Sequence, residues 1–279
     1  MSITLSPDQI QQLKQLFAHA DSLIFSAGAG MGVDSGLPDF RGNQGMWKAY
    51  PELGRQNFDF TQIANPSAFR SQPQLAWGFY GHRLALYRET QPHQGFQRLK
   101  QLAEQLDLPY FVFTSNVDGQ FQKAGFDPEK IYECHGSIHH IQCLDACTDD
   151  IEAADMLEPQ VNSENCQWVG DLPDCLECGG LMRPNILMFN DSTWISTQFD
   201  QQEKRLQHWL NQHRAPLVIE MGAGTAIPSV RMFSEQFAPN IIRINPREAT
   251  LPKKGGMSLP YPALNAISLI FNILSTQQE

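Results

Sequence analysis

The sequence lacks any run of 18 apolar residues, so we expect no segment of it to cross a membrane as a helix. Its first residues, from Met1 to Pro7, lack the basic and apolar stretches of a secretory signal peptide. Basic residues are also few: 20 Lys and Arg stand against 30 Asp and Glu, which gives a net charge of −10. General nucleic-acid binding needs a basic face that releases phosphate counterions. We therefore expect a cytoplasmic protein with no membrane association and no general nucleic-acid binding.

The chain also lacks internal repeats and low-complexity segments. Its 279 residues, 42% of them hydrophobic, allow one large domain or one domain with an inserted module. Six cysteines are present, and in a cytoplasmic chain they indicate a metal site or catalysis before disulfides.

A glycine-rich stretch follows the first predicted strand, and it lacks one glycine of the dinucleotide fingerprint. Residues 21–25 predict the strand, and Gly28, Gly30 and Gly32 come after it. Glycine lets the backbone approach a phosphate, and the N–H groups of a helix start point toward such an anion. Val33 stands where the fingerprint Gly-x-Gly-x-x-Gly has its last glycine. The stretch predicts an anion site, but not that of an ordinary dehydrogenase.

The remaining pattern alternates strands with helices. A capping box at Ser6 and Gln9 predicts an N-terminal helix of about three turns. Further predicted strands cover residues 110–114, 131–134, 216–221 and 240–244, and further helices cover 96–105, 200–212 and 263–274. Such alternation predicts an α/β fold, a parallel sheet covered on both faces.

Polar or glycine-rich residues follow each predicted strand of this sheet. They are residues 26–32, 115–118 and 222–225, together with His135 and Asn245. The carboxyl ends of parallel strands share one edge of the sheet, where ligands bind. We therefore expect these residues to form one site.

Two segments differ in composition from this pattern. Residues 43–92 carry many aromatics and predict a small helical module, whereas residues 138–189 hold most of the cysteines. Cys143 and Cys147 form one pair, Cys175 and Cys178 form a second, and 27 residues separate the two pairs. Four thiolates at this spacing fit a structural, tetrahedral Zn²⁺ site. Cys166 is a spare cysteine without a predicted partner.

In the order of its motifs, the chain resembles the sirtuins, the NAD-dependent protein deacylases. Residues 28–30 followed by residues 35–41 are similar to the family's cofactor loop, and residues 114–118 (Thr-Ser-Asn-Val-Asp) are similar to its nicotinamide-pocket motif. Residues 134–137 (Cys-His-Gly-Ser) resemble the segment of the catalytic histidine. The cysteine pairs resemble its zinc ribbon, and residues 183–191 stand where its substrate-binding strand is expected.

The resemblance implies a Rossmann-like NAD-binding domain and a small domain. Residues 1–42, 93–137 and 190–279 would form the first; residues 43–92, as a helical module, and 138–189, as a zinc ribbon, would form the second. It implies cofactor contacts at Gly28, Ala29, Gly30, Asp39, Phe40, Arg41, Ser115, Asn116, Val117, Asp118, Gly222, Ala223, Gly224, Thr225 and Asn245.

NAD carries a pyridinium leaving group on an anomeric carbon, and its cleavage needs a pocket for the nicotinamide amide. Asn116 and Asp118 offer an amide and a carboxylate suited to hold that group. The acyl oxygen of a modified lysine would be the nucleophile, and His135 would act as general base on a ribose hydroxyl. Met188 and Phe189 would contact the acylated protein substrate.

Tyr80 and Arg83 lie three residues apart in a predicted helix, on one face. In sirtuins that remove acidic acyl groups, a Tyr-x-x-Arg pair at a similar place recognises the distal carboxylate. Arginine suits this role because its guanidinium fork matches a carboxylate. The pair therefore predicts a preference for succinyl- or malonyl-lysine over acetyl-lysine.

Several residues depart from the family pattern. Gly222-Ala-Gly-Thr225 replaces a common Gly-Thr-Ser loop, Gly32 replaces a serine, Ser115 replaces a glutamine, and Asn190-Asp191 replaces Gly-Glu. These departures keep three other interpretations open: a protein ADP-ribosyltransferase, an NAD hydrolase, and a non-catalytic NAD sensor.

Overall fold

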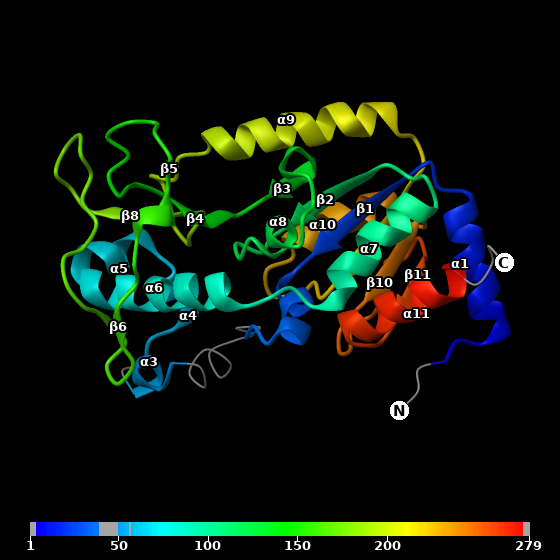
Figure 1. Cartoon of the computed structure of the whole chain (residues 1–279), viewed down its shortest axis with the longest axis horizontal. Coiled ribbons are helices and arrows are strands. Elements are labelled where there is room, and N and C mark those ends of the chain that lie inside the picture. The colour runs from blue at the N-terminus through cyan, green and yellow to red at the C-terminus, as the bar shows by residue number, and fades with distance from the viewer. Residues whose placement is uncertain (1–3, 39–49, 56, 276–279) are drawn as a thin grey trace.

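A computed structural model describes residues 4–38, 50–55 and 57–275. Two lobes lie side by side, and the long helix α9 (Thr197–Gln212) runs along the larger lobe toward the smaller one (Figure 1). The proposed cofactor residues Asp39, Phe40 and Arg41 lie outside the described residues. No helix in the described ranges combines the length and the apolar character needed to cross a membrane.

Six parallel strands form the sheet of the larger lobe. They are β1 (Ser22–Ala27), β2 (Tyr110–Thr114), β3 (Ile131–Glu133), β9 (Pro216–Met221), β10 (Ile241–Ile244) and β11 (Met257–Leu259), in the order β11-β10-β9-β1-β2-β3. Numbered within this sheet alone, the order is 3-2-1-4-5-6 read from the β3 edge, which is that of Rossmann sheets. The order reverses between β1 and β9, so the carboxyl ends of these two strands are where a ligand is expected.

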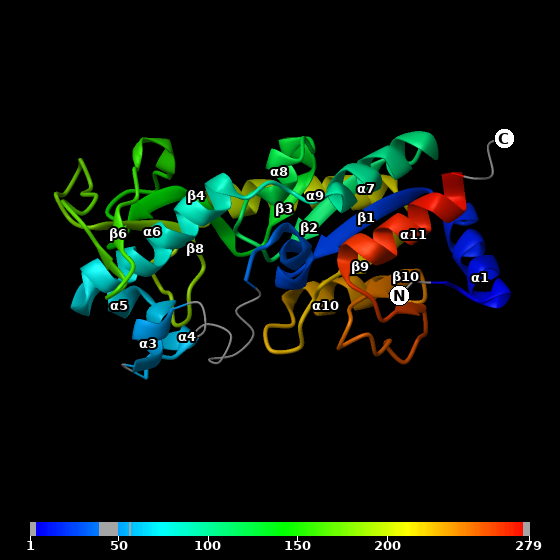
Figure 2. The same ribbon diagram turned by 60° about the horizontal axis from the view of Figure 1, so that its bottom comes forward.

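The two faces of the sheet are covered by different helices (Figure 2). Leu23, Phe25 and Ala27 of β1 pack with α1 (Pro7–Ala18), α7 (Gln94–Gln105) and α11 (Ala263–Ser275). Ile24 points to the opposite face and packs with α9 and with α10 (Ser229–Ser234). Because side chains alternate along a strand, helices on both faces cover all of β1, and all six of its residues are buried, Ser22 and Ser26 included.

Among the described residues, the smaller lobe combines four helices, three of them short, with antiparallel strands. Its helices are α3 (Pro51–Arg55), α4 (Phe60–Ile63), α5 (Pro66–Ser71) and α6 (Pro73–Glu89). Its sheet has the order β5-β4-β8, built from β4 (Gly136–Cys143), β5 (Glu152–Ala153) and β8 (Met182–Ile186), and β6 (Val161–Asn162) pairs with β7 (Gln167–Trp168) as a hairpin.

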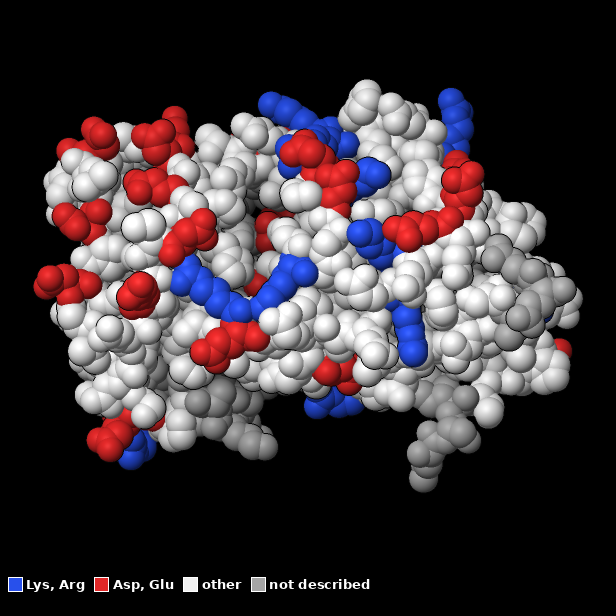
Figure 3. Space-filling view, in the orientation of Figure 1, with Lys and Arg blue, Asp and Glu red and all other residues white. Residues whose placement is uncertain are grey.

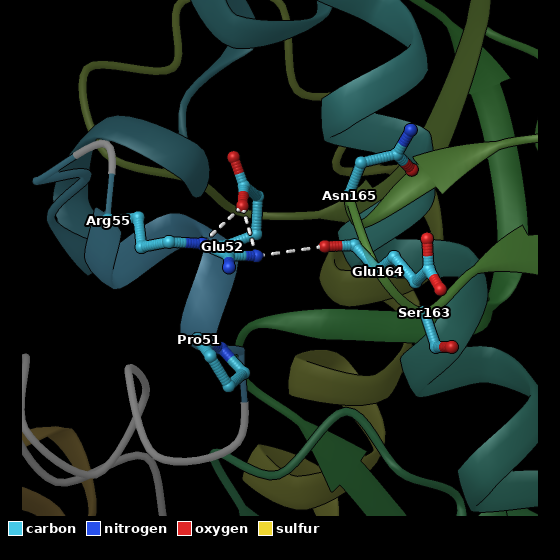
Figure 4. Close-up of a pocket in the computed structure, with 6 residues that line it drawn as sticks. All are labelled: Pro51, Glu52, Arg55, Ser163, Glu164 and Asn165. Atoms are coloured by element: carbon cyan, nitrogen blue, oxygen red, sulfur yellow. Dashed lines mark hydrogen bonds and ion pairs between the residues drawn. The ribbon is translucent and has the colours of Figure 1, made fainter.

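The β6–β7 hairpin packs directly on α6, where two glycines make room for it. A Cβ at Gly78 would lie 2.0 Å from the carbonyl oxygen of Cys166, and a Cβ at Gly81 would lie 2.8 Å from the Trp168 ring. The hairpin turn also contacts α3, because Arg55 donates to the carbonyl oxygen of Glu164 at 3.1 Å beside a surface cavity (Figure 4). The hairpin therefore joins two helices of this lobe.

Charge is unevenly divided between the lobes. The segment from Cys143 to Met182 holds ten Asp and Glu residues and no Lys or Arg. That excess equals the net charge of the whole chain, −10. Figure 3 shows acidic side chains gathered over the smaller lobe.

The N-terminal helix begins as predicted: Ser6 Oγ accepts from the Gln9 N–H at 3.2 Å, and Gln9 Oε1 accepts from the Ser6 N–H at 3.0 Å. Other predictions need correction. The residues after the motif at 115–118 form only the single helical turn α8 (Gln120–Lys123), and β11 has no counterpart among the predicted strands. The glycine stretch continues as a 3₁₀ helix, η1 (Ala29–Ser35).

Side chains fix η1 to two helices of the larger lobe. Asp34 Oδ2 accepts from the Leu264 N–H at 2.8 Å, in the first turn of α11. Ser35 Oγ accepts from the His93 N–H at 3.0 Å, next to the start of α7. The His93 ring donates from Nε2 to the Met31 carbonyl and accepts the Gly95 N–H at Nδ1, both at 3.0 Å. The glycine loop is therefore held in place by the beginnings of α7 and α11.

The neutral His93 ring is required for this arrangement, which predicts a pH dependence of stability. Burial lowers the pKa of His93, because it disfavours the charged imidazolium. A depressed folded-state pKa means that its contribution is complete above about pH 6.5 and is lost as the pH falls through the folded value. His93 is the N-cap residue of α7, and its protonation removes the acceptor of the Gly95 N–H. We expect the loss of this cap to lower the free energy of unfolding by about 1 kcal/mol over that pH range.

The asparagine variant is the matched comparison, because Asn also caps helices but does not titrate. Denaturant unfolding of the wild type and of His93→Asn between pH 7.5 and 5 should show a smaller loss for the variant. Parallel curves for the two proteins would contradict the assignment of this loss to His93. The other histidines are the same in both proteins, so their contributions cancel when the variant's loss of stability is subtracted from that of the wild type.

Candidate active site

A cavity of about 860 Å³ lies between the two lobes, at the carboxyl ends of β1, β2 and β9. The structure brings most of the predicted site residues to its wall. These are Gly28, Ala29, Tyr80, Arg83, Ser115, Asn116, Val117, Asp118, His135, Met188, Phe189, Gly222, Ala223, Gly224 and Thr225. Gly30 and Asn245 do not line it.

The two glycine loops meet backbone to backbone on one side of this cavity. The Gly30 N–H donates to the Gly222 carbonyl oxygen at 3.0 Å, and the Gly28 N–H donates to that of Met221 at 3.0 Å. A Cβ at Gly222 would lie 2.3 Å from the Gly30 carbonyl carbon, and Gly222 has φ +61°. A side chain at this position would separate the loops, so glycine is required here. Gly30 serves this packing instead of facing the cavity.

The motif after β2 places an amide and a carboxyl group beside the first glycine loop. Asn116 Nδ2 donates to the Gly28 carbonyl at 3.1 Å, and Asp118 Oδ1 accepts from the Gln120 N–H at 3.0 Å. Burial raises the pKa of Asp118 to about 6, although the Gln120 N–H and the charge of Arg83 act in the opposite direction. This carboxyl group changes charge close to neutral pH.

His135 follows β3 and faces the same cavity. Its Nε2 lies 3.1 Å from Ser229 Oγ at the start of α10, and its own carbonyl accepts from the Leu187 N–H at 2.9 Å. Burial lowers the pKa of His135, while a backbone contact with Ser115 raises it. The ring is therefore neutral at pH 7, the state that can accept a proton.

Asn245 lies at the predicted edge of the sheet, but its side chain is fully buried. Its Nδ2 donates to the Ala223 carbonyl at 2.9 Å, and its Oδ1 accepts from the N–H groups of Arg247 and Glu248 at 3.0 and 2.9 Å. It therefore shapes the second glycine loop from behind. Arg247 and Glu248 line the cavity in its place, and Glu248 accepts from Thr225 Oγ1 at 2.5 Å.

Tyr80 and Arg83 meet at the end of the cavity formed by α6, as their spacing predicts. The Arg83 guanidinium lies between aromatic rings, 5.3 Å from the centroid of Phe79 and 5.7 Å from that of Tyr80. Arg83 is 8% exposed and Tyr80 is 1% exposed. A third residue, Tyr87, completes this group and lines the same cavity.

The segment after β8 that carries Met188 and Phe189 is held by a buried ion pair. Arg183 Nη2 lies 2.9 Å from Asp191 Oδ1, and both side chains are fully buried. The other oxygen, Asp191 Oδ2, accepts from the Met188 N–H at 3.2 Å, and the Phe189 N–H donates to the Ala64 carbonyl at 2.9 Å. These bonds fix the wall of the cavity nearest to α4 and α5.

The four predicted metal ligands form one cluster in the smaller lobe. All sulfur atoms of Cys143, Cys147, Cys175 and Cys178 lie within 4.8 Å of one another. The Gly180 N–H donates to Cys178 Sγ at 3.4 Å, as backbone groups do toward ligand thiolates. Four thiols at this separation fit a tetrahedral Zn²⁺ that has no open position. Cys166 lies outside the cluster, buried at the hairpin turn.

Several side chains of this site were not predicted from the sequence. Arg247, Glu248 and Tyr87 line the cavity, and Ser229 contacts His135. Tyr87 stands four residues after Arg83 in a predicted helix, and this spacing could have pointed to it. Ser229 and His135 are 94 residues apart, and no local pattern links them.

The sheet order, the paired glycine loops and the cavity at the reversal point define a nucleotide-binding protein of the Rossmann class. The match to a family profile is more specific, since the Sir2 family profile covers residues 28–222. The chain belongs to the Sir2 family.

Two relatives match most of the chain. It is 26% identical over 256 residues to an NAD-dependent protein deacylase of Aquifex aeolicus, covering 91% of this chain and 95% of that protein. It is 28% identical over 253 residues to NAD-dependent protein deacylase 1 of Archaeoglobus fulgidus, covering 89% and 91%. A Sir2 homologue–NAD complex has the same fold, with a TM-score of 0.69, 23% identity, and coverage of 99% of this chain and 96% of that one.

Proposed function

We propose that the protein is an NAD-dependent protein-lysine deacylase that transfers the acyl group to ADP-ribose. The observation that carries this proposal is the convergence of Asn116, Asp118 and His135 on one cavity beside two touching glycine loops. Relatives named as deacylases and a solved structure of Sir2 bound to acetylated peptide support it. The alternatives use the same NAD site and differ in what accepts the ADP-ribose.

Each part of the cavity has a task in this reaction. The backbone at Ala29 and Gly224 lines the cavity where the diphosphate of NAD would lie, and Glu248 offers a carboxylate to ribose hydroxyls. Asn116 and Asp118 hold the carboxamide of the nicotinamide. The acyl oxygen of the lysine bonds to the anomeric carbon as nicotinamide leaves with the bonding electrons. His135 then takes the proton of a ribose hydroxyl, whose oxygen attacks the acyl carbon.

A product assay separates the proposal from its alternatives. The enzyme is incubated with NAD and an acylated lysine peptide, and the products are identified by mass spectrometry. Deacylation predicts nicotinamide release that requires the acyl peptide, together with acyl-ADP-ribose. ADP-ribosylated protein, or free ADP-ribose formed without peptide, would replace the proposal by transferase or hydrolase activity. Tight NAD binding without turnover would indicate a sensor.

The partner proposed for this site is an acylated protein, and its acyl group is proposed to be acidic. The charge of Arg83 lies at the α6 end of the cavity, among aromatic rings that exclude water. A carboxylate at the end of a succinyl or malonyl chain would be paired there, whereas an acetyl group has none. The acidic surface of the smaller lobe favours substrates whose lysine lies in a basic segment.

The variant Arg83→Met tests the acyl class. We expect the wild type to turn over succinyl-lysine peptide with a higher kcat/KM than the acetyl peptide. The substitution should lower kcat/KM for the succinyl peptide about a hundredfold, because a buried ion pair is lost, and should leave acetyl turnover nearly unchanged. Steady-state kinetics on two peptides of one sequence measure both values. Equal or better acetyl turnover by the wild type would refute the acidic preference and leave deacylation itself intact.

A further inference from the structure

The geometry points to Tyr87 as the residue that orients Arg83 toward the acyl group. This inference rests on the proposed deacylase function and on its acidic acyl class, and it assigns a positioning residue that no motif of the chain identifies. Tyr87 lies on α6 one turn after Arg83 and lines the same cavity. It is 5% exposed.

Two hydrogen bonds connect the residues. The Tyr87 hydroxyl oxygen accepts from Arg83 Nε at 3.0 Å and from Arg83 Nη2 at 2.8 Å. Both donors belong to the same edge of the planar guanidinium, so one oxygen sets the direction of the whole plane. The Nη1–Nη2 edge is the other pair of parallel donors, the pair that matches the two oxygens of a carboxylate.

The Tyr87 side chain is uncharged, and this matters as much as its position beside Arg83. A phenol is neutral at physiological pH, and burial raises the pKa of Tyr87 further above its ordinary value. Tyr87 therefore holds the guanidinium without cancelling its charge. A carboxylate in the same place would pair with Arg83 and remove the field that attracts an anionic acyl group.

Three aromatic rings surround the Arg83 guanidinium and make its orientation important for ligand binding. The guanidinium carbon lies 5.3 to 5.7 Å from the ring centroids of Phe79, Tyr80 and Tyr87. Rings on several sides confine the cation and exclude water, so a hydrogen bond that fixes its direction has a large effect on how it meets a ligand. Removing that bond leaves the charge in place but takes away the acceptor that sets the direction of the Nε and Nη2 donors.

The substitution Tyr87→Phe tests this inference, since it removes the acceptor oxygen and keeps the ring. We expect KM and the NAD-free Kd for a succinyl-lysine peptide to rise about tenfold, with kcat changed less than about twofold. Both constants for the acetyl peptide should stay at their wild-type values. In the Arg83→Met background, Tyr87→Phe should have no further effect, because the group it orients is gone.

Tyr132→Phe is the matched control, because Tyr132 is equally buried, at 5% exposed, on β3 and does not line the cavity. It should leave the binding of both peptides unchanged. The inference is overturned if Tyr87→Phe leaves succinyl binding unchanged, if it weakens acetyl and succinyl binding equally, or if its effect persists in the Arg83→Met background. Peptide binding by fluorescence anisotropy needs no turnover, so a failure of the deacylase proposal appears in the kinetics alone.

Discussion

The His135→Ala variant is expected to lose acyl transfer by about 10²- to 10⁴-fold in kcat, the usual contribution of a general base. The imidazole lines the cavity after β3, and burial lowers its pKa, so that it is neutral at pH 7. Production of acyl-ADP-ribose, followed by mass spectrometry, measures the loss. The variant should still bind NAD, since both glycine loops and Asn116 are unchanged.

The order of the steps gives a sharper test than the loss alone. His135 acts after the nicotinamide–ribose bond has broken, so exchange of labelled nicotinamide into NAD, with acyl peptide present, should survive in His135→Ala. In the wild type, kcat should fall only below about pH 6.5, because a base with a lowered pKa stays deprotonated to lower pH than an ordinary histidine. His140→Ala, which changes a half-buried histidine of β4 that does not line the cavity, serves as the control. Full acyl transfer by His135→Ala, or equal losses in the two variants, would exclude the general-base role.

Much of this site could be predicted from the chain because its residues follow apolar strands directly. The runs that became β1, β2, β3 and β9 are short and mostly apolar, which is typical of strands buried on both faces. Once these are parallel, their carboxyl ends share one edge, and the residues after them must meet. Local sequence therefore carried the information for Gly28, Asn116, His135 and Gly222.

The sequence did not reveal the direction of some side chains or the shortest strand. Asn245 occupies the expected edge, yet it turns inward because its amide satisfies three backbone groups of the second glycine loop and the turn after β10. Glu248, three residues later, lines the cavity instead. The strand β11 has only three residues and follows two glycines at positive φ, so its sequence shows no strand periodicity.

Removal of zinc is expected to unfold the smaller lobe first and to abolish acyl-peptide binding before NAD binding. Cys143 and Cys175 belong to the same apolar core as Trp168 and the α6 residues Trp77 and Tyr80. Without the metal, four thiols hold the ribbon together only through weak contacts. The β6–β7 hairpin then loses its support, and α6, which carries Arg83 and Tyr87, loses the surface it packs on.

The variant Cys178→Ala removes one ligand at an exposed position and avoids a cavity in the core. We expect a loss of about 4 kcal/mol or more, as for other metal-site losses, which corresponds to roughly 10 °C in Tm for a chain of this size. Cys166→Ala is the matched control, since Cys166 lies in the same segment but outside the cluster, and its Tm should fall by much less. Metal analysis should find one zinc per chain in the control and clearly less in Cys178→Ala.

In the metal-depleted protein, Kd for the acyl peptide should rise at least tenfold while Kd for NAD changes less than about threefold, because the glycine loops belong to the other lobe. Equal losses of NAD and peptide binding, or no loss of either, would show that the ribbon does not position α6.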